Sequence, residues 1–85
     1  MSTVLCISFS VQEANRLLKT SWYRRSMDSG KVYRPVAGVE NVRGIVNAEV
    51  WLLPGYEKHP EWKEMWIYLS RPGNLLTRKG GNLDV

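Results

Sequence analysis

The spacing of apolar and polar positions changes several times along the first half of the chain. Residues 3–9 are apolar at nearly every position and partly β-branched, which is typical of a buried strand. Residues 11–27 repeat apolar side chains every three or four positions, as a helix with one core-facing side does. Ser10 and Glu13 form the S-x-x-E capping pattern at the start of this helix, and Gly30 follows its end.

The second half of the chain contains patterns that favour strands. Residues 42–53 alternate between two faces, and residues 65–71 are apolar on both. The sequence RPGN suits a type II turn, so residues 75–78 are expected to fold back as a third strand. Residues 31–34 suit a short edge strand.

Together these elements predict an α+β fold with two layers. One amino-terminal strand and helix pack on an antiparallel sheet of three to four strands, in the order β-α-β-β-β. A chain of 85 residues is expected to form one small domain over residues 1–85, and residues 79–85 are expected to form a loose tail.

Composition sets the environment that we expect for the protein. The single cysteine, Cys6, excludes an intrachain disulfide, and small secreted domains usually need one, so we expect a cytoplasmic protein. No apolar run approaches the roughly 20 residues of a membrane span, and the amino terminus lacks the pattern of a signal peptide. We therefore expect a soluble protein without a membrane partner.

The net charge of +4 lies entirely in the opening segment. Residues 1–34 carry six Lys or Arg and two acidic residues, whereas residues 35–85 carry six of each. A one-sided positive field attracts anionic partners, here nucleic acid, an acidic protein or a nucleoprotein complex. Arginine can donate two parallel hydrogen bonds to phosphate, and tyrosine can stack on exposed bases. The candidate anion-binding residues are Arg16, Lys19, Tyr23, Arg24, Arg25, Lys31, Tyr33 and Arg34.

The aromatic residues of the second half predict a protein interface. If one face of the sheet packs on the helix, the other face carries large apolar side chains, and such exposed patches mark interfaces. Two arrangements satisfy this pattern: an open face that binds a partner or a second copy of the chain, or a face that the loop 54–64 covers. The candidate interface residues are Trp51, Trp62, Trp66 and Tyr68.

Candidate chemistry is sparse in this sequence. One Cys and one His, far apart, do not make a zinc site, and no glycine-rich phosphate loop is present, so no metal or cofactor is expected. Cys6 lies inside an apolar run, which indicates a buried hydrophobic residue rather than a nucleophile. The candidate acid–base residues are His59, Glu57 and Tyr56, a set of the kind that small ribonuclease toxins use.

Three functions follow, in order of preference. The first is a non-enzymatic binding protein that presents its basic helix, and the segment after it, to nucleic acid or to a nucleic-acid-handling complex. The second is a small inhibitor or adaptor of the size that viruses and mobile elements encode, acting through the aromatic sheet face. The third is a ribonuclease-type toxin that uses His59.

Overall fold

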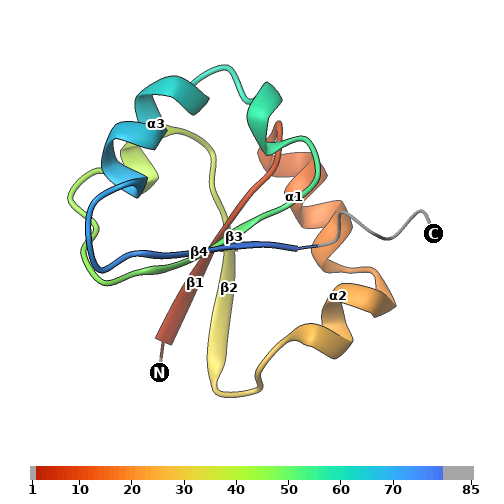
Figure 1. Ribbon diagram of the computed structural model, residues 1–85. Coiled ribbons are helices and arrows are strands. Elements are labelled where there is room, and N and C mark those ends of the chain that lie inside the picture. The colour runs from red at the N-terminus through yellow and green to blue at the C-terminus, as the bar shows by residue number, and fades with distance from the viewer. Residues whose placement is uncertain (1, 80–85) are drawn as a thin grey trace.

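The computed structural model describes residues 2–79 as a small α+β domain with a four-stranded sheet between helices (Figure 1). The strands are β1 (Ser2–Ile7), β2 (Lys31–Pro35), β3 (Glu49–Leu52) and β4 (Leu75–Arg78). The helices are α1 (Val11–Leu18), α2 (Ser21–Ser26) and α3 (Trp62–Leu69), with 3-10 turns η1 (Val39–Asn41) and η2 (Tyr56–Lys58). The predicted strands at 3–9, 31–34 and 75–78 are confirmed as β1, β2 and β4.

The sheet is parallel throughout, in the order β2-β1-β3-β4. The predicted antiparallel meander is therefore wrong. Parallel neighbours need a crossover connection rather than a tight turn, and each pair of strands here has one. Helices α1 and α2 connect β1 to β2, and α3 connects β3 to β4.

The decisive difference from the sequence prediction is that residues 65–71 lie mostly in α3 and not in a strand. Met65 and Leu69, four positions apart, are buried, whereas Trp66 and Ile67 are exposed. This is helical periodicity, and a short apolar run cannot be distinguished from a strand by pattern alone. The predicted strand at 42–53 is shortened to β3, because turns with positive φ at Gly44 and Asn47 precede it.

The predicted helix at 11–27 is divided into α1 and α2. Thr20, between them, has an extended backbone (φ −73°, ψ 154°), and its hydroxyl donates a hydrogen bond to the Leu17 carbonyl at 2.8 Å. Threonine competes for backbone hydrogen bonds in this way, which favours helix ends over helix interiors. The break redirects α2, so that Tyr23 enters the core.

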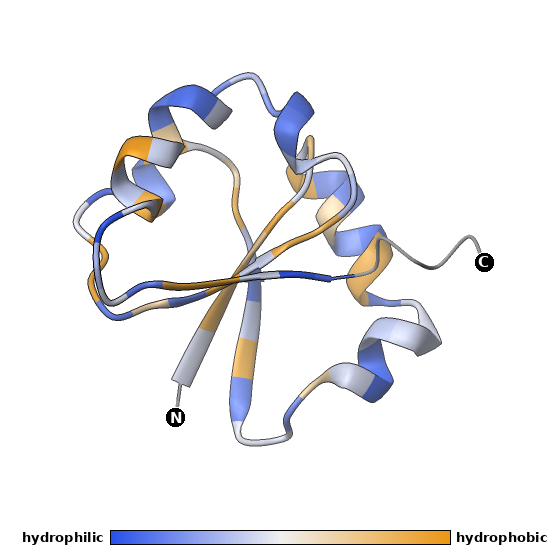
Figure 2. Ribbon diagram, viewed as in Figure 1, coloured by the Kyte–Doolittle hydropathy of each residue, from blue (hydrophilic) through white to orange (hydrophobic). Residues whose placement is uncertain are grey.

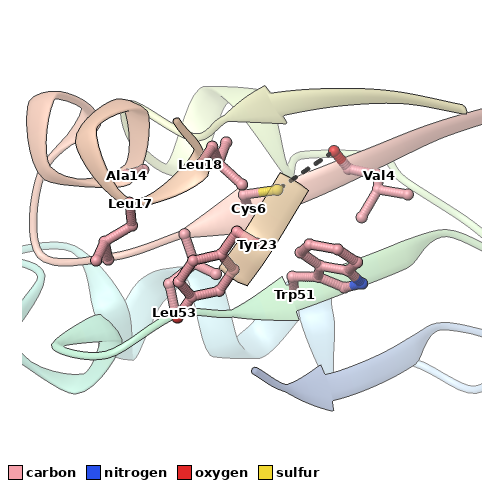
Figure 3. Packing of buried hydrophobic residues seen from close by; sticks show 8 residues of the cluster. All are labelled: Val4, Cys6, Ala14, Leu17, Leu18, Tyr23, Trp51 and Leu53. Carbon is pink, nitrogen blue, oxygen red and sulfur yellow. Dashed lines mark hydrogen bonds between the residues drawn. The ribbon is translucent and has the colours of Figure 1, made fainter. Parts of the chain in front are cut away.

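Helices α1 and α2 cover one face of the sheet. Their buried side chains meet those of β1 and β3 in a tight apolar cluster (Figure 3). Tyr23 is fully buried there, and its hydroxyl donates to the Lys79 carbonyl at 3.0 Å. The cluster consists of Val4, Cys6, Ala14, Leu17, Leu18, Tyr23, Trp51 and Leu53.

Helix α3 and the turn η1 cover the opposite face. Alternation along the strands sends Ile7, Val50 and Leu52 to this side, where they meet Met65 and Leu69 of α3. Figure 2 shows apolar segments along the strands and on parts of α1 and α3, whereas other parts of these helices are hydrophilic. Because both faces are covered, the open sheet face predicted as an interface is absent among residues 2–79.

The predicted tail at 79–85 lies outside the described residues except for Lys79. Its N–H donates to the Leu52 carbonyl at 3.0 Å, and its ammonium lies 4.8 Å from the ring centroid of Trp51. Lys79 therefore continues the pairing of β4 with β3. Over residues 2–79, no helix has both the length and the apolar character to cross a membrane.

Candidate functional site

The registers of the sheet align the carboxyl ends of its strands. Ile7 pairs with Leu52, and Leu52 with Arg78, so β1, β3 and β4 end side by side. From β1 the chain runs outward to β2 and then returns across the sheet to β3. In open parallel sheets, ligands bind outside the carboxyl ends of the strands, near such a reversal. A ligand site is therefore expected at this edge of the sheet.

A groove of about 410 Å³ opens at the carboxyl ends of β3 and β4. We call it the aromatic groove. Volumes of this size are typical of sites for small molecules or for single residues of a larger ligand. Its lining residues come from β3, η2, α3 and β4: Leu52, Tyr56, Glu57, Trp62, Trp66, Leu76 and Arg78.

Three aromatic rings form one continuous wall of this groove. Tyr56 and Trp62 meet edge to face, with centroids 4.9 Å apart, and Trp62 and Trp66 lie 5.8 Å apart. The two tryptophans are four positions apart on α3, which places them on the same side of the helix. Trp66 is 46% exposed although it is a large apolar side chain. A tryptophan left open beside a ring cluster offers a flat stacking surface to a ligand.

The groove also carries one positive and one negative side chain. Arg78 ends β4 and Glu57 lies in η2, and both are exposed. Within residues 2–79, neither takes part in an ion pair, so both are available to a ligand. An arginine donates up to five N–H groups and a carboxylate only accepts, so the two recognise different parts of a bound molecule.

A second hollow, of about 480 Å³, lies at the reversal point between β1 and β3. We call it the switch-point hollow; it is lined by Phe9, Glu13, Pro54, Gly55 and Lys58. The buried Ser8 hydroxyl donates to the Pro54 carbonyl at 2.7 Å and so ties together the two segments that form it.

The predicted basic residues do not form one continuous surface. Arg16 is paired with Glu13, and Lys31 with Glu49 at 2.8 Å. These pairs raise the pKa of Arg16 and of Lys31, chiefly through the side-chain hydrogen bonds. Strand alternation turns Arg34 away from Lys31, toward the other sheet face.

The two tyrosines of the predicted basic surface are occupied within the protein. Tyr23 is buried, and Tyr33 packs on Trp51 with ring centroids 4.7 Å apart. A hollow at the amino end of β2 does bring Arg24, Lys31 and Tyr33 together, while Lys19 and Arg25 are exposed elsewhere on the α1–α2 side.

The predicted aromatic interface is likewise divided. Trp62 and Trp66 line the groove, but Trp51 is 2% exposed and lies in the core under α1 and α2. Tyr68 packs against the core on the α3 side, with the Arg71 guanidinium 5.2 Å from its ring centroid. Trp66 and Tyr68 would share one side of a strand, whereas side chains two positions apart on a helix point in different directions.

The candidate acid–base residues are separated. His59 is buried, and both of its ring nitrogens bond to the backbone. The Glu61 N–H donates to Nδ1 at 3.0 Å, so Nε2 carries the proton and donates to the Ala37 carbonyl at 3.1 Å. Tyr56 and Glu57 instead line the aromatic groove. His59 thus has no nitrogen free to exchange a proton with a substrate in this arrangement.

Sequence reasoning missed three side chains of these sites that could contact a ligand: Phe9, Lys58 and Arg78. Their common signal is position, since each lies in a carboxyl-terminal half of a strand or in the segment after one. That signal has meaning only when the strands are parallel. Among residues 2–79, no three His, Cys, Asp or Glu side chains gather as metal ligands.

Comparisons with protein-family models, with curated proteins and with solved structures found no match for this chain. Function is therefore inferred from the geometry of the two hollows.

Proposed function

We propose that this protein is a non-enzymatic binder of single-stranded nucleic acid that stacks a base in the aromatic groove. The observation that carries the proposal is the half-exposed Trp66 beside Trp62 and Tyr56, with Arg78 at the rim. Proteins that bind single strands combine aromatic stacking platforms with cations that meet the phosphates. The groove offers both within one volume of about 410 Å³.

The two charged side chains of the groove, like its rings, suit a nucleotide. Arg78 can donate to phosphate oxygens through two parallel N–H groups. Glu57 can accept a hydrogen bond from an amino group of a base or from a ribose hydroxyl. The net charge of +4 favours the approach of a polyanion, although most of this excess lies on the α1–α2 side and serves as a long-range attraction.

A protein partner is the competing occupant, because tryptophan, tyrosine and arginine also dominate protein interfaces. The lining favours nucleic acid on two grounds. Arg78 and Glu57 are both without ion-pair partners among residues 2–79, which suits a ligand that carries donors as well as phosphate. The three rings also contact one another within one hollow, which gives a base a stacking surface, rather than lying apart on the protein surface.

The test is fluorescence anisotropy with a labelled single strand of about eight nucleotides, within the usual range of single-strand sites. Trp66→Ala is expected to weaken binding about 5- to 150-fold, the value of one stacked base. Ile67→Ala is the matched control, because Ile67 is on the same helix and 63% exposed but does not line the groove. It should bind as the wild type does.

A second pair of variants separates the groove from the basic helix. Arg78→Gln and Arg25→Gln each remove one exposed positive charge. Arg78→Gln should weaken binding and reduce the slope of log K against log salt by about 0.7, the loss of one phosphate contact on a single strand. Arg25→Gln should change the affinity only slightly. The opposite ranking would move the site to the helix, and absence of binding to either RNA or DNA single strands would reject the proposal.

A further inference from the structure

We infer that the switch-point hollow is a second base subsite, so that the ligand unit is two consecutive nucleotides rather than one. This inference rests on the function proposed above. The two hollows lie on either side of one short segment: Tyr56 and Glu57 line the aromatic groove, whereas Gly55 and Lys58 line the hollow. Because the two hollows share this segment, we assign the switch-point hollow to the nucleotide that follows the base on Trp66.

Phe9 supplies the stacking surface of this second subsite. Its side chain is 45% exposed at the end of the sheet, two residues after the end of β1. The ring is held by close contact with Gly55, where an added Cβ would lie 2.9 Å from Phe9 Cδ2. Gly55 also has φ +89°, a conformation that side chains rarely adopt. The segment after β3 thus passes closely against Phe9 and supports the ring.

The charges of the hollow suit a phosphodiester linkage. Of its two charged lining residues, Glu13 is paired with Arg16, whereas Lys58 is exposed and has no ion-pair partner among residues 2–79. The pairing holds the pKa of Glu13 below its usual range, chiefly through the hydrogen bond from Arg16. Lys58, the last residue of η2, is then the uncompensated positive charge of the hollow and can meet a phosphate there.

The experiment compares adenosine monophosphate with the dinucleotide pApA as competitors of the labelled strand. The wild type should bind pApA about 5- to 150-fold more tightly than adenosine monophosphate, because a second base stacks. Phe9→Leu and Phe9→Ala should abolish this ratio without changing the affinity for adenosine monophosphate. Val46→Ala is the control, since Val46 is 68% exposed but precedes β3, at the opposite edge of the sheet.

The thermal unfolding midpoint of each variant checks that it is folded. If Phe9→Ala is unstable, Phe9→Leu serves in its place, because leucine keeps an apolar contact with Gly55. A wild-type ratio near one, or an equal loss of both competitors in the Phe9 variants, would overturn the second subsite. The proposed function would survive that result if Trp66→Ala still lowered the affinity for adenosine monophosphate. If neither competitor displaced the strand and the strand itself did not bind, both proposals would fail.

Discussion

His59 shows how one buried side chain can join two loops of this edge. Its Nε2–H bonds to Ala37, which follows β2, and its Nδ1 accepts from Glu61, which precedes α3. The Glu61 carboxylate strengthens the same junction, accepting from the Val39 N–H at 2.7 Å. The imidazole is therefore a structural link between the β2 end of the sheet and the start of the helix that carries the groove.

We expect His59→Ala to lower the free energy of unfolding by about 1–3 kcal/mol, because two part-buried hydrogen bonds to the backbone are lost, each worth about 0.5–1.5 kcal/mol. Urea denaturation measures the change, and Lys63→Ala, at an exposed position of α3, is the control. A stable His59→Ala protein that had lost an RNA-cleaving activity of the wild type would instead favour the catalytic role.

At the residue scale, the sequence predicted which side chains line the groove better than it predicted which residues lie beside them in the folded protein. Trp62 and Trp66 were candidates from composition, and both line the groove. Arg78 could not be paired with them, because they come together only through the parallel pairing of β3 with β4. The spacing of Tyr23 fits the polar side of a continuous helix, but the break at Thr20 turns this residue into the core.

Helix α1 is the element for which the sequence signal was most direct. The expected cap is present: the Ser10 side chain accepts a hydrogen bond from the Glu13 N–H at 3.1 Å. The Glu13 carboxylate turns instead to Arg16, with Nε 2.9 Å from Oε1. The Ser10 side chain thus caps the helix as expected. The Glu13 side chain forms an ion pair with Arg16 instead of the second hydrogen bond of the capping box.

Ser10→Ala is expected to reduce the free energy of unfolding by about 1 kcal/mol, within the usual range of about 0.5–2 kcal/mol for a lost amino-terminal cap. Ser21→Ala is a suitable comparison, since Ser21 is an exposed first residue of α2 whose helix has no side-chain cap. Denaturation curves of the two variants should differ in midpoint but not in slope. Equal midpoints would show that the Ser10 bond adds no net stability.

The error in the fold class came from one element. Residues 62–69 contain Met65, Ile67 and Leu69 at strand spacing and Trp62, Met65 and Leu69 at helical spacing, and eight residues are too few to decide. With a strand in this place, the turn after it implied a hairpin. With a helix in this place, β3 and β4 become a parallel pair with a crossover, and the groove appears at their carboxyl ends.

At the scale of the whole molecule, the core under α1 and α2 contains two groups whose ionisation opposes folding. Burial raises the pKa of the Cys6 thiol from 9.0 to about 12, and burial raises that of Tyr23 from 10.0 to about 12. Between pH 10 and pH 12, the unfolded chain has released the protons of the thiol and of the phenol, whereas the folded chain retains them. The free energy of unfolding must then fall as pH rises.

We therefore expect full stability below about pH 9 and a progressive loss as the pH approaches 12, at up to about 1.4 kcal/mol per pH unit for each group. Urea denaturation at a series of pH values measures this slope. Cys6→Ala should flatten the slope between pH 9 and pH 10, where only the thiol titrates, and leave the steeper fall above pH 10. An unchanged slope in the variant would show that the thiol is accessible in the folded protein.

The strand order has a consequence for how the chain reaches its structure. Strand β1 is made first but lies in the middle of the sheet, with β2 on one side and β3 on the other. Its pairing with β3 joins Val4 to Glu49 and Ile7 to Leu52, which are 45 positions apart in a chain of 85 residues. Such distant pairings slow folding, because a long loop must close before they form. On the ribosome, β1 must keep one edge unpaired until β3 has emerged, and this interval exposes the nascent chain most to mispairing with a neighbour.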